Sequence, residues 1–276
     1  MFPLVVLADV RLSAKSRRMN IEFGAGTSWA VMGPGEPSAL FDVIAKVKRP
    51  QAGSVNLGGP IVESGGVSKW RKSLMDFAKQ LPLGGDLEAV AEALAVLHLW
   101  DSRRLTLDQL DRRSTAHAAL LPLFLAAPGS ILLCKQHLDA LDPWVLPGVL
   151  DFLTRRLKSE SVLLAWTSRP DIAESMDNLL VFHRQEIAFA GSVEELIARG
   201  GQEAMTIRVG NEPIARALVK PFQVEATSSP GGELQLLSPA NQDMAAHLLS
   251  HGYGNVELVQ SRPKTLEEAL RDLPLI

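Results

Sequence analysis

The fold that we expect for this chain is decided by one stretch, Trp29-Ala30-Val31-Met32-Gly33-Pro34-Gly35-Glu36-Pro37-Ser38-Ala39-Leu40. Its first four residues are apolar and predict a strand, and from Leu40 onward apolar residues recur at helical spacing. A strand, a tight glycine-rich turn and a helix form the setting of a phosphate-binding loop, which works through backbone N–H groups, a helix N-terminus and a lysine. This stretch contains no lysine, Pro37 lacks a backbone N–H, and Glu36 places a negative charge where an anion would sit. The sequence therefore predicts the position of such a loop without its chemistry.

Length, composition and charge narrow the class of protein. The 276 residues suffice for one large or two modest domains, and 46% hydrophobic with 21% charged residues is typical of an ordinary folded protein. A net charge of −3 gives no electrostatic reason to expect nucleic acid as a partner, and the six histidines show no metal-ligand spacing. The single cysteine, Cys134, excludes an internal disulfide and fits a reducing compartment.

Nothing in the hydropathy pattern predicts a membrane span. No apolar run approaches the roughly 18 residues that cross a bilayer, and the start of the chain lacks the pattern of a signal peptide. We therefore expect a cytoplasmic chain whose membrane association comes through a partner.

Strands alternate with helices over the first 200 residues, which predicts an α/β fold. Residues 74–78 predict a further strand, and residues 86–126 predict a helical subdomain because apolar residues recur there at spacings of three and four. The pattern changes around Gly200-Gly201. The segments that follow predict strand, helix, strand, strand, helix and strand, the order of a split βαβ, ferredoxin-like module, at 203–209, 212–219, 222–228, 233–238, 240–250 and 255–261. We expect two domains, 1–200 and 201–276, the second a small αβ domain that ends in a helix.

In the order of its motifs, the first domain resembles the ATP-binding subunit of an ABC transporter. The resemblance rests on Gly33-Pro34 at the Walker A position, on the helix end and turn at 44–55, on Leu141-Asp142-Pro143 at the D-loop and on the closing segment 182–196. The tail at 263–268 and the additional small domain are similar to those of the exporter-type branch. The resemblance implies an ABC-type P-loop ATPase core with a helical subdomain.

The residues that carry the chemistry of this family are replaced. Aligned on Ile44-Ala45, the Walker A loop is two residues shorter than the family pattern, and Pro37 and Ser38 fall where the lysine and the magnesium-binding hydroxyl belong. At the Walker B position, Lys135 and Gln136 stand in place of the carboxylates that hold magnesium and polarise the attacking water. Because phosphoryl transfer depends on positioning and charge stabilisation, we expect no meaningful turnover.

The other motif positions are altered as well. The signature aligns with Leu110-Asp111-Arg112-Arg113-Ser114, where arginines replace two glycines; we interpret them as a solvated face, with contact to an anion as the alternative. Ser168 matches the switch histidine, and Gln80 is a weak match to the Q-loop glutamine. The D-loop, Leu141-Asp142, is nearly whole, and we expect Asp142 to be the N-cap of a helix that starts at Pro143.

Two roles are open for Lys135. It pairs with Glu36 and fills the vacant phosphate site, which we favour because both charges would otherwise be unpaired in a partly buried cleft. Alternatively, it replaces the missing loop lysine and binds an anion together with Ser38.

The resemblance implies a subunit that docks on a polytopic membrane permease at the cytoplasmic face of the membrane, and the replaced motif residues indicate that it is a catalytically inactive pseudo-ATPase. A coupling helix of the permease would lie between Gln80–Asp86 and the helical subdomain. An active ABC ATPase subunit or a second copy of the chain is a further candidate partner. We expect no cofactor; ATP and magnesium would bind only if the nucleotide site were functional despite its replaced residues. The alternatives are a scaffold or regulatory protein without a permease, and an atypical active ATPase.

Overall fold

The computed structural model describes residues 2–66, 70–157, 160–198, 202–209, 212–220, 226–228, 233–239, 250, 256–263, 265–271 and 273. The chain divides into two compact units, the first ending at Ser192 and the second beginning at Val193. The sequence placed this boundary near residue 200. The structure moves α8 (Val193–Ala198) into the second unit, where α8 packs against α11 (Leu266–Arg271).

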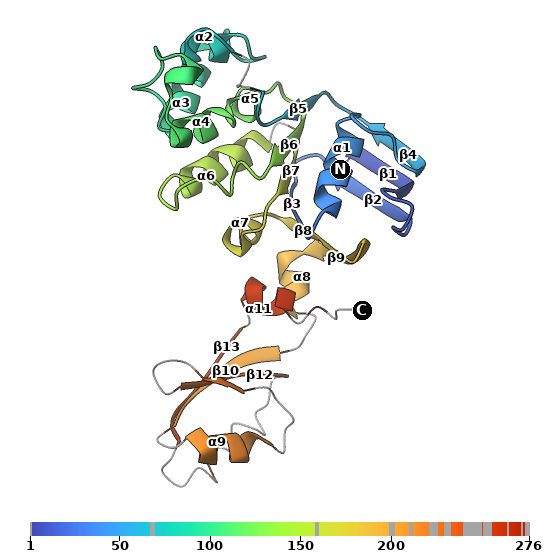
Figure 1. The fold of residues 1–276 in the computed structure, drawn as a ribbon, viewed down its shortest axis with the longest axis vertical. Helices are drawn as coiled ribbons and strands as arrows, with labels where there is room; N and C mark the ends of the chain where they lie inside the picture. The colour runs from blue at the N-terminus through green and yellow to red at the C-terminus, as the bar shows by residue number, and fades with distance from the viewer. Residues whose placement is uncertain are drawn as a thin grey trace. The chain divides into compact units, whose positions relative to one another are not determined.

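The first unit contains two sheets (Figure 1). The larger has the strand order β5-β6-β7-β3-β8-β9, in which all neighbouring strands are parallel except β8 and β9. The smaller is antiparallel with the order β2-β1-β4. The strands of the larger sheet are β3 (Ser28–Met32), β5 (Ile61–Glu63), β6 (Ile131–Lys135), β7 (Val162–Trp166), β8 (Asn178–His183) and β9 (Glu186–Ser192), and those of the smaller are β1 (Pro3–Arg11), β2 (Met19–Gly24) and β4 (Ala52–Leu57).

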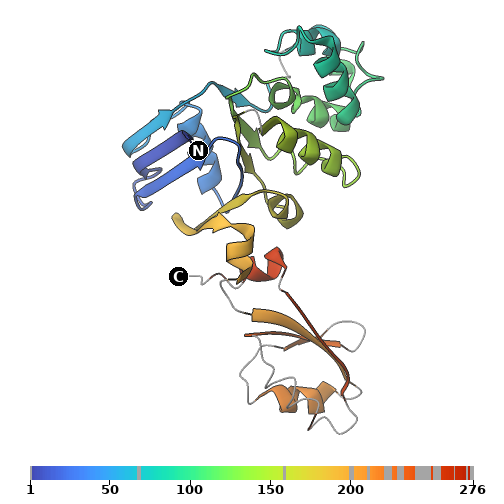
Figure 2. The same ribbon diagram turned by 180° about the vertical axis from the view of Figure 1, so that it is seen from behind.

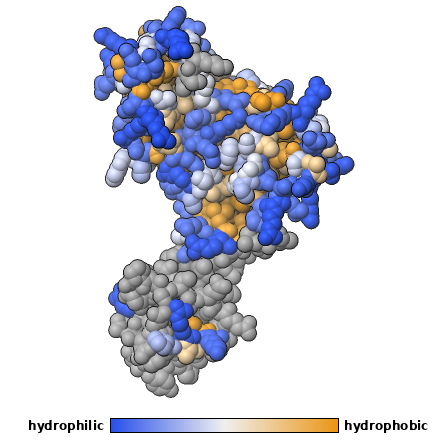
Figure 3. Space-filling view, in the orientation of Figure 1, coloured by the Kyte–Doolittle hydropathy of each residue, from blue (hydrophilic) through white to orange (hydrophobic). Residues whose placement is uncertain are grey.

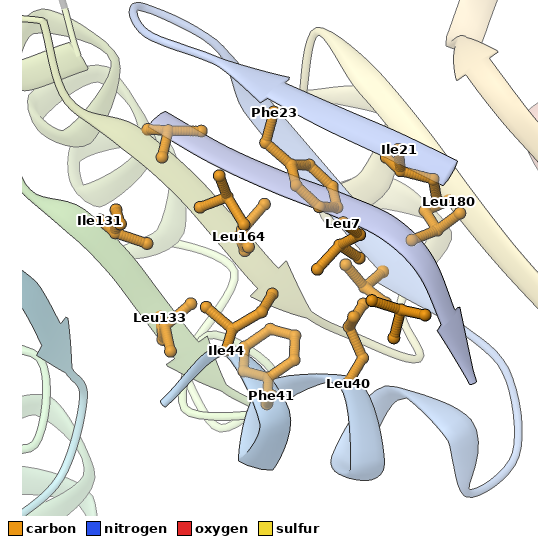
Figure 4. Close-up of a cluster of buried hydrophobic side chains, with 14 of the residues drawn as sticks. Leu7, Ile21, Phe23, Leu40, Phe41, Ile44, Ile131, Leu133, Leu164 and Leu180 are labelled. Atoms are coloured by element: carbon orange, nitrogen blue, oxygen red, sulfur yellow. The ribbon is translucent and has the colours of Figure 1, made fainter. Parts of the chain in front are cut away.

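Side chains from both sheets and from helix α1 (Glu36–Ile44) meet in one apolar core (Figure 4). Helix α1 contributes Leu40, Phe41 and Ile44, all fully buried. Helix α6 (Leu146–Leu157) lies on the other side of the larger sheet from α1 (Figures 1 and 2). Because both faces are covered, β6 and β7 are apolar and buried along almost their whole length rather than alternating.

The helical segment predicted at 86–126 is confirmed, and it begins earlier than expected. The helices α2 to α5 and the short 3-10 helix η2 are called the helical group below; they are α2 (Leu74–Lys79), α3 (Leu87–Val96), η2 (Leu107–Gln109), α4 (Arg112–Ala118) and α5 (Leu121–Phe124). The strand predicted at 74–78 is wrong. Ser73 caps the first turn of α2 by accepting from Asp76 N–H at 3.2 Å, and its hydroxyl donates to the Asp76 carboxylate at 2.7 Å.

A short helix, α7 (Pro170–Glu174), follows β7 and completes the first unit. None of the helices in the described ranges is long and apolar enough to cross a bilayer.

The second unit contains a four-stranded sheet of order β11-β12-β10-β13, and every described pairing in it is antiparallel. Its elements are β10 (Gln202–Val209), α9 (Glu212–Val219), β11 (Ala226–Ser228), β12 (Glu233–Pro239) and β13 (Val256–Pro263). This order agrees with the predicted strands of a split βαβ module. Apart from Ser250, the helix predicted at 240–250 lies outside the described residues, so the ferredoxin-like assignment stays a prediction.

Candidate functional site

The motif positions converge on one edge of the larger sheet. Because β3, β5, β6 and β7 run parallel, their carboxyl ends lie at the same edge, which we call the carboxyl edge. Open α/β sheets bind their ligands outside the carboxyl ends of the strands. The loop that begins at Gly33, Lys135 and Gln136 at the end of β6, and Ser168 just beyond β7 therefore all lie at the carboxyl edge.

The loop after β3 is short and fits against protein rather than around an anion. Gly33 has φ +127°, and a Cβ there would come within 2.4 Å of the carbonyl oxygen of Phe182 on β8. Glycine is therefore required by close packing at this position. Helix α1 begins immediately after Gly35, with Pro37 in its first turn, which removes one backbone donor. One carboxylate oxygen of Glu36 is buried here and has no hydrogen-bond partner among the described residues.

Lys135 lies in an ionic network, but its partner is not the one that we favoured from the sequence. Its ammonium nitrogen is 2.9 Å from a carboxylate oxygen of Glu63 at the end of β5 and 3.7 Å from Asp42 on α1. Among the described residues it forms no ion pair with Glu36, so the predicted Lys135–Glu36 pair is wrong. The reason is register: Glu63 ends the strand beside β6, and Asp42 lies in the second turn of α1.

Asp42 also pairs with Lys48, at 2.7 Å. The hydrogen bond from Lys48, its charge and the charge of Lys135 together lower the pKa of the Asp42 carboxyl, against the opposing effect of burial. Both carboxylates nearest to the Lys135 ammonium are thus engaged by cations.

Ser64, which sequence reasoning missed, joins β5 to the end of β6. Its hydroxyl oxygen accepts the Lys135 backbone N–H at 3.1 Å and lies 2.6 Å from Nδ1 of His137. Burial, and then the charge of Lys135, lowers the pKa of His137, which favours its neutral imidazole. Gln136, between these residues, is exposed and has φ +57°. The signal for Ser64 in the sequence was its place directly after a short apolar strand.

Gln80 is not brought to the carboxyl edge. It is the exposed C-cap residue of α2, inside the helical group. The segment that follows it also belongs to this group, since Leu83 N–H donates to the Leu125 carbonyl at 3.0 Å. The groove expected between Gln80–Asp86 and the helical subdomain stays a prediction, with both of its sides drawn from the helical segment of the chain.

Beyond β7, Ser168, the residue matched to the switch histidine, is hydrogen-bonded to Asp139, a residue that the sequence analysis did not identify. Asp139 accepts hydrogen bonds from the Thr167 hydroxyl at 2.5 Å and from the Ser168 N–H and hydroxyl, both at 2.9 Å. Arg169 adds hydrogen bonds to the carbonyl oxygens of Asp139 and Leu141 at 3.4 and 3.0 Å. These bonds fix the loop after β7 to the loop after β6.

The altered signature contacts the D-loop of the same chain. Asp111 caps α4 by accepting from Ser114 N–H at 2.6 Å, and Arg113 forms an ion pair with Asp142. Arg112 is exposed, as a solvated face requires, but Arg113 is not free. The helix expected to start at Pro143 is α6, which begins at Leu146; the Asp142 carbonyl accepts the N–H groups of Val145 and Leu146 at 3.0 and 3.1 Å, while its carboxylate pairs with Arg113.

These side chains do not fit a magnesium–nucleotide complex. The loop offers no lysine and carries a buried carboxylate oxygen of Glu36, and the end of β6 presents the ammonium of Lys135 where a metal would need a carboxylate. In the described part of the chain, no three His, Cys, Asp or Glu side chains gather in a way that could hold a metal ion. Cys134 is fully buried, which raises the pKa of its thiol to about 11.

Comparison with known proteins finds likeness in structure alone. No family model and no curated protein matches the chain. An ATP-bound bacterial Atm1-family ABC exporter is similar with a TM-score of 0.62 and 17% identity, over 71% of this chain and 40% of that one. CbiO1 from Clostridium perfringens, part of the CbiONQ ABC transporter complex, is similar with a TM-score of 0.54 and 15% identity, over 72% of this chain and 92% of that one.

A third solved structure, the dimeric ATP-binding cassette MJ0796 in a post-hydrolysis state with ADP and Pi, is similar with a TM-score of 0.58 and 15% identity, over 68% of this chain and 98% of that one. The chain thus spans less than half of the Atm1-family exporter and nearly all of the two ATP-binding subunits. At these identities the likeness establishes architecture: the chain has the α/β P-loop fold of ABC transporter ATPase domains.

Proposed function

We propose that this chain is an ABC transporter ATP-binding-type subunit that has lost ATP hydrolysis and acts by docking on a membrane permease of an exporter-type complex. In this role it lies at the cytoplasmic face of the membrane and binds neither ATP nor magnesium. Its task is to hold or regulate the complex, alone, as a pair of identical chains or beside an active ATPase subunit.

The single observation that carries the proposal is the position of Lys135. Its ammonium lies at the carboxyl end of β6, 2.9 Å from Glu63 and 3.7 Å from Asp42. A divalent cation cannot share this space with an ammonium, because like charges repel and the neighbouring carboxylates are already paired. The missing loop lysine and the Glu36 carboxylate act in the same direction, since both disfavour a polyphosphate.

Support for a permease partner comes from the neighbours and from the helical group. The CbiO1 structure is described as part of a transporter complex. Within this chain, the helical group and its loop between α3 and η2 expose three large apolar side chains, Leu87 at 64%, Trp100 at 42% and Leu105 at 39%. Figure 3 shows mainly hydrophilic side chains over this group with isolated apolar ones, which suits a mixed contact rather than a broad apolar interface.

A nucleotide-binding measurement tests the proposed loss of ATP binding and hydrolysis. A ligand at 100 times its Kd would stabilise the folded chain by about 2.7 kcal/mol, which corresponds to a rise in Tm of roughly 5–10 °C for a unit of this size. We expect no shift in Tm with ATP and magnesium compared with magnesium alone. A saturable, magnesium-dependent rise in Tm would refute the proposal that the chain binds neither ATP nor magnesium.

Site-directed crosslinking tests the proposed docking on a membrane permease. Since Cys134 is buried and its thiol pKa is raised to about 11, cysteines placed on the surface can be labelled selectively with a photocrosslinker. Leu87→Cys and Trp100→Cys probe the helical group, and Phe2→Cys, which is 88% exposed and outside that group, is the matched control. We expect adducts with a polytopic membrane protein from the first two variants in native membranes. Adducts only with proteins of the soluble fraction would instead support a scaffold without a permease.

A further inference from the structure

The end of the small sheet where β1 finishes and β4 begins carries a surplus of positive charge that the function proposed above does not use. Residues 11–18 contribute four Lys or Arg side chains and residues 46–49 contribute three, and neither segment contains Asp or Glu. Because the whole chain has a net charge of −3, this surplus is local to one end of the first unit. We call the six exposed cations of the two segments the basic end; they are Lys15, Arg17, Arg18, Lys46, Lys48 and Arg49.

Backbone pairing brings the two basic segments together. Strand β1 ends at Arg11, whose carbonyl oxygen accepts the Gln51 N–H at 2.8 Å. The loop 12–18 follows Arg11 directly and the turn 46–50 precedes Gln51 directly, so the two segments lie side by side. In Figures 1 and 2 the small sheet and the helical group lie on opposite sides of the larger sheet. The basic end is therefore separate from the face proposed for permease docking.

Local hydrogen bonds hold both segments in shape. After α1, the Asp42 carbonyl oxygen accepts the N–H groups of Val47 and Lys48 at 2.9 and 3.1 Å. In the loop after β1, the Ser13 N–H donates to the Ser16 hydroxyl at 2.9 Å, and the Ser16 N–H donates to the Ser13 carbonyl oxygen at 3.2 Å. The cations are thus carried on turns that are already formed, which lowers the entropic cost of binding.

Ion pairs within the chain engage only part of the basic end. Arg17 pairs with Glu186 and Lys48 pairs with Asp42, each at 2.7 Å. The other four cations form no ion pair with a described residue; they are Lys15, Arg18, Lys46 and Arg49. The positive charge is therefore not cancelled by ion pairs within the described part of the chain, and an outside anion can reach it.

An apolar side chain among these cations narrows the class of partner. Val47 lies between Lys46 and Lys48 and is 66% exposed. Neither basic segment contains an aromatic residue, whereas protein–protein interfaces are enriched in aromatic residues and depleted in lysine. Single-stranded nucleic acid is likewise bound by stacking on aromatic rings. An anionic bilayer fits better, because its headgroups attract Lys and Arg and an aliphatic side chain can enter the boundary between headgroups and acyl chains.

We propose that the basic end binds directly to a membrane surface that contains anionic lipids. The four cations without an ion pair lie at the anionic headgroups, and Val47 inserts among them. The contact is peripheral and reversible, because it combines a few charges with one aliphatic side chain. It goes beyond the proposed docking on a permease and does not depend on it, since the lipid itself is the partner.

Flotation of the full chain with lipid vesicles tests this contact in the absence of any permease. Vesicles of phosphatidylcholine with about one third phosphatidylserine are the probe, and vesicles of phosphatidylcholine alone are the control. We expect binding to the anionic vesicles only, and this binding should weaken as salt is added, because ions screen the attraction. No binding to the anionic vesicles at low salt, or equal binding to both kinds, would overturn the proposal.

Variants of exposed residues separate charge from insertion. Each Lys or Arg near an anionic surface contributes about fivefold to binding, so Lys46→Gln combined with Arg49→Gln should weaken it roughly 25-fold. The matched control, Arg71→Gln combined with Lys72→Gln, removes two exposed cations just before α2 and should change binding by less than about twofold. Val47→Ser leaves the charge unchanged and should weaken binding about fourfold or more, the contribution of one buried CH₂ group.

Two results with these variants would contradict the assignment. Equal losses in the control and in the variant of the basic end would show that net charge alone, and not this surface, governs binding. Full displacement of the chain by soluble poly-glutamate, together with unchanged binding of Val47→Ser, would assign the basic end to an acidic polypeptide instead of a membrane.

Discussion

Replacement of Lys135 by methionine keeps most of the side-chain volume and removes the positive charge. In the structure the ammonium lies between Glu63 and Asp42, on two different elements, and so links the edge strand β5 and helix α1 to the end of β6. Asp42 keeps Lys48 as a partner after the change, but Glu63 loses the cation at 2.9 Å. The perturbation therefore leaves one partly buried carboxylate without its ion pair.

The expected cost lies between two limits. Exposed ion pairs contribute about 0.2–1 kcal/mol, and removing one partner of a fully buried pair costs about 3–5 kcal/mol. The side chains here are 28% exposed for Lys135, 35% for Glu63 and 18% for Asp42, so the site is intermediate. We expect the Lys135→Met variant to lose about 2 kcal/mol of unfolding free energy, and its Tm to fall by roughly 4–8 °C.

Thermal and denaturant unfolding of the full chain measure this loss, with Lys48→Met as the matched control. Lys48 is 67% exposed and pairs with Asp42 alone among the described residues, so its replacement should cost less than about 1 kcal/mol. A double-mutant cycle with Glu63→Gln should show coupling of about 1 kcal/mol between positions 63 and 135. Equal unfolding of Lys135→Met and Lys48→Met, with no coupling in the cycle, would show that Lys135 does not hold these elements together.

Three further outcomes follow from the site. Pro37→Lys alone should not restore ATP hydrolysis, because the loop stays short and Lys135 still occupies the metal position; turnover above that of the unchanged chain would contradict the alignment. Cys134, fully buried with a thiol pKa of about 11, should resist a thiol reagent in the native chain and react once denaturant is added, so rapid native labelling would contradict its placement. The pKa of His137 is lower in the folded chain than its ordinary 6.5, so the folded state binds this proton more weakly. Stability from this group is therefore complete above about pH 6.5 and falls as the pH drops, and unfolding curves of His137→Gln between pH 7.5 and 5 should show a smaller fall than those of the unchanged chain.

Several features were decided by the sequence alone, because they depend on residue type and local order. A strand, a glycine turn and a helix around Gly33 predicted the α/β core, and the identities of Pro37, Lys135 and Gln136 predicted an altered site. The loss of the loop lysine, and the replacement of a carboxylate by Lys135, can be recognised from residue identity without knowing the orientation of the side chains. The helical segment at 86–126 was predictable for a similar reason, since its apolar period is local.

The tertiary structure alone decided which of these residues meet. Lys135 pairs with Glu63 rather than Glu36 because β5 is the parallel neighbour of β6, a fact of strand order that no local pattern contains. Strand order and register likewise bring Ser64 to His137, and the packing of the loops after β6 and β7 brings Asp139 to Ser168. The basic end has the same origin, since its two segments meet only where β1 pairs with β2 and β4. Local sequence fixes which groups are available, but long-range pairing and packing determine the charges and hydrogen bonds that each of them encounters.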